Sequence, residues 1–124
     1  MRWLNCERNF PVNEIRVDFS RRVLKEIERL NRKYPRTLDE VEKLVEQLKA
    51  GKRPGDKIPD IGYNVFKVRL KNPSAGRGKQ GGFRAIYYVR IAEHIILLTI
   101  YSKSEREDIS AGDIQHVIDD IEGD

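Results

Sequence analysis

The sequence predicts an α+β domain, in which a mainly antiparallel four-stranded sheet carries an N-terminal helical hairpin on one face and is followed by a short C-terminal helix. Three observations predict this fold class. Apolar residues alternate along three segments and fill a fourth almost completely, they recur at helical spacing along three others, and the 124 residues suffice for one modest core. Along the chain these segments follow one another as strand, two helices, three strands and helix.

The first strand and the first helix are predicted between residues 15 and 34. Ile15, Val17 and Phe19 alternate as they do in a short strand. Ser20 is a good N-cap for the helix that follows, and Pro35 ends that helix because the residue before a proline is disfavoured in the helical region. The apolar stripe of this helix consists of Val23, Ile27, Leu30 and Tyr34.

A second helix is predicted after a short connection. Thr37 and Glu40 have the spacing of a capping box, and Gly51 is well placed to stop the helix. We expect the two helices to form a hairpin that covers one face of the sheet. The apolar stripe of the second helix consists of Leu38, Val41, Leu44, Val45 and Leu48.

Three strands and a closing helix are predicted in the second half of the chain. The turn-rich segment 52–62 is expected to be extended, and alternation predicts strands over 65–70 and 83–91. Segment 95–101 is apolar at nearly every position, which predicts a central strand buried on both faces. Ser110 is the expected N-cap of a helix whose stripe is Ile114, Val117, Ile118 and Ile121.

Residues 14–124 are predicted to form a single domain, preceded by a poorly ordered extension over residues 1–13. The extension lacks the apolar stretch and small-residue cleavage site of a secretory signal. No apolar run approaches the roughly 20 residues of a membrane helix. Cys6 is the only cysteine, which excludes an internal disulfide and a cysteine-based zinc cluster. We therefore expect a cytoplasmic protein that has no membrane contact.

Positive charge is concentrated in the middle of the chain. Residues 52–90 contain ten basic and two acidic residues, a net charge of +8, so that the rest of the chain carries −4 of the total of +4. A cationic segment inside an otherwise acidic chain favours a polyanion such as nucleic acid as the partner. A solvated basic surface is the alternative that charge alone leaves open.

Strand alternation predicts a cluster of cations on one face of the sheet. In the second predicted strand Lys67 and Arg69 fall on one side, about 7 Å apart at a rise of ~3.3 Å per residue. In the next strand Arg84 shares a face with Tyr88 and Arg90. If these strands are neighbours, the cations converge and repel one another unless an anion binds between them. Ordinary solvated strand residues are the alternative.

Two loops next to this face add further cations. Segment 75–82 contains four glycines together with Arg77 and Lys79, and such a loop can approach a phosphate backbone and donate amide N–H groups to it. Its spacing matches neither a Walker loop nor a dinucleotide fingerprint. Lys103 and Arg106 follow the last strand. A flexible hairpin and a balanced surface turn are the respective alternatives.

Three segments resemble toxins of the RelE/ParE superfamily, which belong to type II toxin–antitoxin systems. Segment 58–70 resembles the loop and the Lys-x-Arg/Lys strand of RelE-type toxins. Segment 76–89 resembles the glycine-rich hairpin of the HigB-like branch, and segment 97–110 resembles its closing strand and acidic turn. The order of elements is similar as well, and the resemblance spans Glu14 to Ile121.

This resemblance implies a ribosome-dependent mRNA endoribonuclease that uses no metal and no cofactor. The 2′-hydroxyl attacks the adjacent phosphate and leaves a 2′,3′-cyclic or 3′-phosphate and a 5′-hydroxyl. By position, the catalytic residues are Lys67, Arg69, Arg84 and Lys103. A lysine crowded by arginines suits a general base, while the arginines stabilise the phosphorane. The residues expected to contact RNA are Arg77, Lys79, Tyr88, Arg90, Tyr101 and Arg106.

The implied partners are mRNA in the ribosomal A site and a cognate antitoxin encoded in the same operon. Two positions depart from the RelE pattern. Ser104 stands where that pattern has an arginine, and Ser110 stands where it has a tyrosine near the start of the final helix. The general acid is therefore open among Tyr88, Tyr101 and Lys103.

Two other functions stay open at this point. A ParE-like toxin would inhibit DNA gyrase without cutting RNA. An inactive protein that is still bound by an antitoxin would neither cut RNA nor inhibit gyrase.

Overall fold

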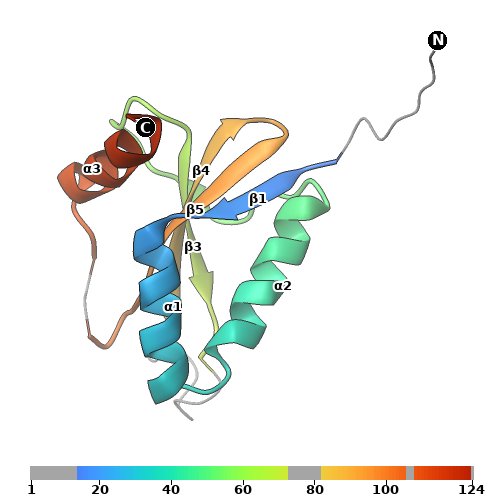
Figure 1. Cartoon of the computed structure of the whole chain (residues 1–124), viewed down its shortest axis with the longest axis vertical. Coiled ribbons are helices and arrows are strands. Elements are labelled where there is room, and N and C mark those ends of the chain that lie inside the picture. The colour runs from blue at the N-terminus through green and yellow to red at the C-terminus, as the bar shows by residue number, and fades with distance from the viewer. Residues whose placement is uncertain (1–13, 73–81, 106–107, 124) are drawn as a thin grey trace.

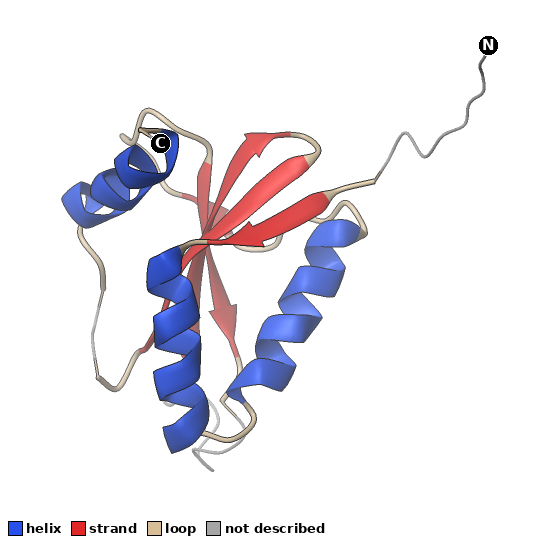
Figure 2. Cartoon of the chain, in the orientation of Figure 1, coloured by secondary structure: helices blue, strands red, loops and turns tan. Residues whose placement is uncertain are grey.

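The computed structural model describes residues 14–72, 82–105 and 108–123, and these form a sheet with helices on both faces (Figure 1). Figure 2 shows α1 and α2 on one side of the strands and α3 on the other. The predicted extension over residues 1–13 lies outside the described residues. In chain order the elements are β1 (Arg16–Phe19), α1 (Arg21–Lys33), α2 (Thr37–Lys49), β2 (Asp56–Lys57), β3 (Val65–Leu70), β4 (Phe83–Ile91), β5 (His94–Ser102) and α3 (Ala111–Glu122).

The predicted α+β class is confirmed, but the sheet has one strand more than predicted. Its five strands are in the order β1-β5-β4-β3-β2. β1 runs parallel to β5, and the other three pairs are antiparallel. The prediction of four strands missed β2, because a strand of two residues is too short to show alternation.

Both predicted serine caps are confirmed. The Oγ of Ser20 accepts a hydrogen bond from the amide of Val23 at 3.0 Å and donates one to the carbonyl of Leu98 at 2.8 Å, which ties the start of α1 to β5. Ser110 caps α3 in the same way, since its Oγ accepts from the amide of Asp113 at 3.0 Å. The first and last helices of the described chain are therefore fixed at their N-termini by side chains.

The predicted capping box of α2 is wrong. Thr37 is already inside the first turn of α2, and its hydroxyl donates to the carbonyl of Tyr34 at 2.7 Å. Glu40 contacts Lys43 at 3.0 Å instead of reaching back to the helix start. At the other end the prediction is right, because the helix stops at Lys49 and Gly51 follows with a φ of 92°.

Two apolar clusters lie on the two faces of the sheet. β5 contributes to both, which confirms the prediction of a central strand buried on two sides. The cluster beneath α1 and α2 takes its strand residues from Val68, Phe83, Ala85, Tyr87, Ile95, Leu97 and Ile100. The cluster beneath α3 takes its strand residues from Val65, Ile86, Tyr88, Ile96, Leu98 and Tyr101.

A cationic pocket on one face of the sheet

Three of the predicted cations come together on the sheet face that also bears α3. Arg69 of β3 and Arg84 of β4 are direct cross-strand partners, and Lys67 is paired with Ile86 two residues along. Direct partners in an antiparallel pair point to the same face, with Cβ atoms about 5 Å apart. One surface pocket of about 370 Å³ is lined by Gly55, Asp56, Lys67, Val68, Arg69 and Arg84, and we call it the cationic pocket. The predicted convergence is thus observed.

The two arginines of the cationic pocket differ in exposure. Arg84 is only 8% exposed, and its Nη1 donates to the carbonyl of Phe83 at 3.4 Å, whereas Arg69 is exposed. In the described part of the chain neither guanidinium has a carboxylate partner. Like charges that face each other across a strand pair are destabilising, and an anion between them would remove the repulsion. Guanidinium groups bind phosphate oxygens in pairs, so a phosphate suits this arrangement.

Asp108 links the third cation to a tyrosine. Its Oδ1 accepts hydrogen bonds from the Nζ of Lys67 at 3.4 Å, from the hydroxyl of Tyr101 at 3.0 Å and from the amide of Ile109 at 2.9 Å. Tyr101 is the β5 partner of Arg84, so it lies in the same cross-strand row as the arginines. The Ile109 amide and the Tyr101 hydroxyl hold the pKa of Asp108 below its ordinary value, which keeps the carboxylate charged.

Asp56 is a carboxylate of the cationic pocket that sequence reasoning missed. It is the β2 partner of Lys67, and its side chain has no hydrogen-bond or ion-pair partner within the described ranges. The pairing could not be predicted because β2 was not. A signal in the sequence could have indicated Asp56, because residues 52–90 contain only two acidic residues among ten basic ones. Asp108 was missed because its neighbourhood has the mixed charges of a surface turn.

Gly55 allows β2 to lie close to β3 at the edge of the cationic pocket. Its φ is 91°, which favours glycine. A Cβ at this position would clash with the carbonyl oxygen of Lys67 and would lie 2.9 Å from the Cα of Val68. The close approach that brings Asp56 beside Lys67 therefore requires a residue without a side chain.

Tyr88 and Arg90 lie at the other end of β4, where they contact α3 rather than the pocket. Tyr88 is 5% exposed, and its hydroxyl donates to Glu122 Oε2 at 2.7 Å. Arg90 Nη2 lies 3.1 Å from Oε1 of the same carboxylate. Burial, followed by the hydrogen bond to Glu122, raises the pKa of Tyr88 to about 12. The positions of these two side chains give no support to the prediction that they contact RNA.

The other predicted residues lie outside the pocket lining or outside the described chain. Lys103 is exposed in the turn after β5, and its amide donates to the carbonyl of Gly82 at 3.0 Å, next to the start of β4. Ser104, one of the two departures from the RelE pattern, is hydrogen-bonded through its Oγ to that of Ser102 at 2.9 Å. The predicted RNA-binding residues Arg77, Lys79 and Arg106 lie outside the described residues.

Two features are absent from residues 14–72, 82–105 and 108–123. Within these ranges, no three histidine, cysteine or acidic side chains are grouped so that they could hold a metal ion. None of the described helices has the length and apolar character that crossing a membrane demands.

The fold and the pocket define a small α+β protein that can hold an anion between strand-mounted cations. A family model described as the RelE toxin of the RelE/RelB toxin–antitoxin system matches residues 21–119, which is well over half of the chain. The chain therefore belongs to the RelE toxin family. It is a toxin of a type II toxin–antitoxin system, in which the partner of the toxin is an antitoxin.

Proposed function

We propose that this toxin is an mRNA endoribonuclease and that the cationic pocket is its active site. The observation that carries the proposal is the meeting of Lys67, Arg69 and Arg84 at one pocket, beside the Tyr101–Asp108 hydrogen bond. Cleavage of a phosphodiester passes through a phosphorane whose charge is spread over its oxygens. Cations that are already fixed in place stabilise such a transition state without reorganisation.

The two arginines would bind the non-bridging oxygens of the scissile phosphate. They face each other across β3 and β4, and Arg84 is held by its burial and by the carbonyl of Phe83. A planar guanidinium can donate two parallel hydrogen bonds to a phosphate, which a lysine cannot. We therefore assign Arg69 and Arg84 to binding the phosphate and stabilising its transition-state charge.

The reaction also needs a base and an acid. The 2′-hydroxyl loses its proton, its oxygen attacks the adjacent phosphorus, and the bond from phosphorus to the 5′-oxygen breaks. An arginine cannot take a proton at neutral pH, and Lys67 is ion-paired with Asp108. Asp108 already accepts three hydrogen bonds, so we assign the base to Asp56, which lines the pocket and has no partner among the described residues.

Lys67 is the group that we assign as the acid. Its ammonium lines the pocket and would give a proton to the leaving 5′-oxygen, which leaves a 2′,3′-cyclic phosphate and a 5′-hydroxyl. Among the three earlier candidates, Tyr88 is buried under α3 and the Tyr101 hydroxyl is bound to Asp108. Lys103 is exposed in the adjacent turn, where we assign it to contact the RNA backbone.

We further infer that the substrate is mRNA in the ribosomal A site. The resemblance to RelE-type toxins supports this substrate. The partner would be a cognate antitoxin from the same operon, acidic enough to match the basic segment of this chain. The site of action would be the cytoplasm.

The test compares the toxin with two single variants in bacterial cells. Arg69→Ala removes an exposed cation from the cationic pocket, and Lys57→Ala is the matched control, because it removes an exposed cation from β2, one residue beyond Asp56 and outside the pocket lining. We expect the wild type and Lys57→Ala to arrest growth and to produce new 5′ ends in primer extension of a transcript. Arg69→Ala should lower cleavage about a hundredfold or more while circular dichroism shows a folded protein.

Three results would contradict the proposal in different ways. Full toxicity of a folded Arg69→Ala variant would show that the cationic pocket is not the active site. Growth arrest with intact transcripts and accumulated gyrase–DNA cleavage complexes would identify a gyrase poison. Absence of growth arrest by the wild type would identify an inactive protein.

A further inference from the structure

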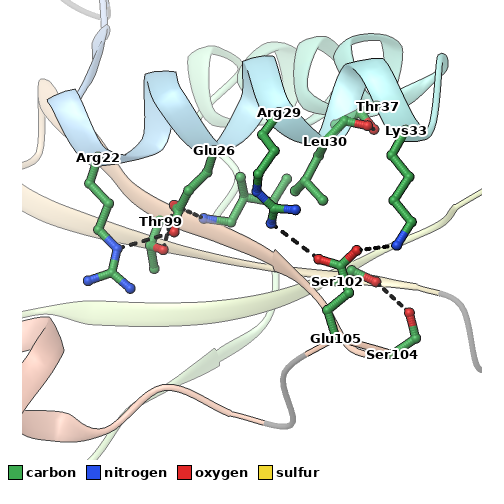
Figure 3. Close-up of polar contacts among 11 residues, drawn as sticks. Arg22, Glu26, Arg29, Leu30, Lys33, Thr37, Thr99, Ser102, Ser104 and Glu105 are labelled. Atoms are coloured by element: carbon green, nitrogen blue, oxygen red, sulfur yellow. Dashed lines mark hydrogen bonds and ion pairs between the residues drawn. The ribbon is translucent and has the colours of Figure 1, made fainter.

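A second cluster of charges lies on the α1 side of the sheet, where the helix meets the turn after β5 (Figure 3). Glu105 Oε1 lies 3.2 Å from Arg29 Nη2, and Oε2 lies 2.6 Å from Lys33 Nζ. The hydrogen bond to Lys33, followed by that to Arg29, holds the pKa of Glu105 below its ordinary value, and Glu105 raises the pKa of Lys33. One carboxylate therefore binds two cations of α1.

The geometry of α1 places both cations within reach of Glu105. Arg29 and Lys33 are four residues apart, so they project from the same face of α1 on successive turns. An isolated exposed ion pair contributes little because two long side chains must be ordered for each contact. Here Glu105 is ordered once for two partners, and its side chain is only 25% exposed.

The turn that carries Glu105 is also attached to the sheet. Its residues 102–105 are closed by a hydrogen bond from the Glu105 amide to the carbonyl of Ser102 at 3.0 Å. The Lys103 amide donates to the carbonyl of Gly82 at 3.0 Å, immediately before β4. The turn is therefore held on one side by α1 and on the other by Gly82, the residue before β4.

Two residues that we assign to the candidate site lie in this turn or after it. Lys103 belongs to the turn, and Asp108 lies three residues after Glu105. Asp108 reaches Tyr101 and Lys67 on the opposite face of the sheet from α1. Glu105 therefore contacts α1, and Asp108, three positions later in the sequence, contacts Lys67 of the cationic pocket.

We propose that Glu105 is a positioning residue, whose ion pairs with Arg29 and Lys33 fix the turn 102–105 so that Lys103 and Asp108 keep their places beside the cationic pocket. The catalytic consequence rests on the proposed ribonuclease function. The structural part does not, because it can be measured without RNA. No contact between Glu105 and substrate is implied.

The first readout is amide hydrogen exchange at two positions, followed by NMR. The Lys103 amide is bonded to Gly82 across the turn, and the Ile109 amide is bonded to Asp108. In Glu105→Ala we expect both amides to exchange at least about tenfold faster, since local opening becomes easier by the loss of two ion pairs. The paired amides of β3 and β4 should keep their wild-type rates.

Two kinds of control test whether the specific ion pairs of Glu105, rather than the loss of any charge from this surface, fix the turn. Glu28→Ala and Arg32→Ala remove exposed charges from α1 that have no partner among the described residues, and we expect wild-type exchange in both. A triple variant that carries Glu105→Lys, Arg29→Glu and Lys33→Glu reverses every charge of the cluster. It should restore slow exchange at the two amides, because the attraction is the same with the signs exchanged.

The second readout is cleavage of mRNA on ribosomes by the purified proteins. A displacement of about 1 Å at a reacting group can cost on the order of a hundredfold in rate, so Glu105→Ala should lower kcat about tenfold or more with little change in KM. The charge-reversed triple variant should recover most of kcat. A residue that only stabilised the fold would lower the amount of active protein but would leave the kcat of each folded molecule unchanged.

Each outcome decides a different part of the inference. Unchanged exchange at Lys103 and Ile109 in Glu105→Ala overturns the positioning role. Faster exchange with wild-type kcat overturns the connection between the turn and the pocket. Failure of the wild type to cut RNA defeats the proposed function, while the exchange measurements still decide whether Glu105 fixes the turn.

Discussion

The two faces of the sheet are built from the same strands but differ in what they carry. On the face under α1 and α2, side chains of β3 and β4 form a continuous apolar layer that includes Phe66, Val68 and Tyr87. On the other face the apolar cluster beneath α3 includes Val65, and β3 then presents Lys67 and Arg69 to the pocket. β3 therefore supplies the cluster beneath α1 and α2 with Phe66, Val68 and Leu70, and supplies the pocket with Lys67 and Arg69.

The face that bears α3 is itself divided along the strands. At one end Val65 is paired with Tyr88, and both are buried in the cluster beneath α3. At the other end Arg69 is paired with Arg84, and both line the cationic pocket. Hydrophobic burial and charge repulsion thus occur about 13 Å apart on a single pair of strands, at a rise of ~3.3 Å per residue. Burial at one end offsets the cost of crowded cations at the other.

The largest expected effect is a difference in the free energy of unfolding between a variant of one face and a variant of the other. Leu97 is fully buried in the cluster beneath α1 and α2, so Leu97→Ala should lower the free energy of unfolding by about 2–5 kcal/mol. Arg69→Ala removes an exposed cation and should change it by less than about 0.5 kcal/mol. Urea denaturation of both variants measures the difference. An equally large loss of stability in both variants would contradict the conclusion that Leu97 stabilises the fold while Arg69 serves the pocket.

The second prediction concerns the edge of the pocket. Gly55→Ala adds a Cβ that clashes with the Lys67 carbonyl at a φ of 91°, and we expect a loss of about 1–3 kcal/mol together with weaker cleavage. Gly51→Ala is a matched control, because its φ of 92° is similar but a Cβ there has no atom within 4 Å. It should cost only the strain of the positive φ, about 1 kcal/mol.

Urea denaturation and the cleavage assay again provide the measurements. Equal losses of stability in the two glycine variants would mean that the close approach of β2 to β3 does not matter. A full loss of cleavage in Gly51→Ala would mean that the end of α2, rather than the pocket edge, controls activity.

The strand residues of β3 that pack beneath α1 and α2 could be predicted from the sequence one by one. Alternation along β3 and β4 is a local signal, and it assigned Phe66, Val68 and Leu70 to the helix side before any pairing was known. The convergence of Lys67, Arg69 and Arg84 followed from the same signal once β3 and β4 were taken as neighbours. Patterns of period two and 3.6 thus predict both the core and the positions of strand-mounted cations.

What could not be predicted depends on contacts between segments without a period. β2 has two residues, so neither its pairing nor the place of Asp56 beside Lys67 is visible in the sequence. Asp108 and Glu105 reach their partners from a turn, where no alternation indicates which way a side chain points. The parallel direction of β1 is also invisible, because parallel and antiparallel strands share the same side-chain alternation.

The smallest expected effect compares two adjacent tyrosines that face opposite sides of the sheet. Tyr87 lies in the cluster beneath α1 and α2, Tyr88 in the cluster beneath α3, and burial raises the pKa of each to about 12. In the unfolded chain both tyrosines would deprotonate near their ordinary pKa of 10.0. Their contribution to stability is therefore fully present below that pH and is lost as the pH rises toward about 12.

Glu122→Gln removes the negatively charged acceptor of the Tyr88 hydroxyl and leaves the surroundings of Tyr87 unchanged. It should lower the pKa of Tyr88 modestly, because burial is the larger cause of the raised pKa, and it should leave the pKa of Tyr87 as it is. Absorbance titration of the phenolates in the wild type, in Glu122→Gln and in a Tyr87→Phe control measures this, and an equal shift of both tyrosines in Glu122→Gln would show that the two faces are not independent.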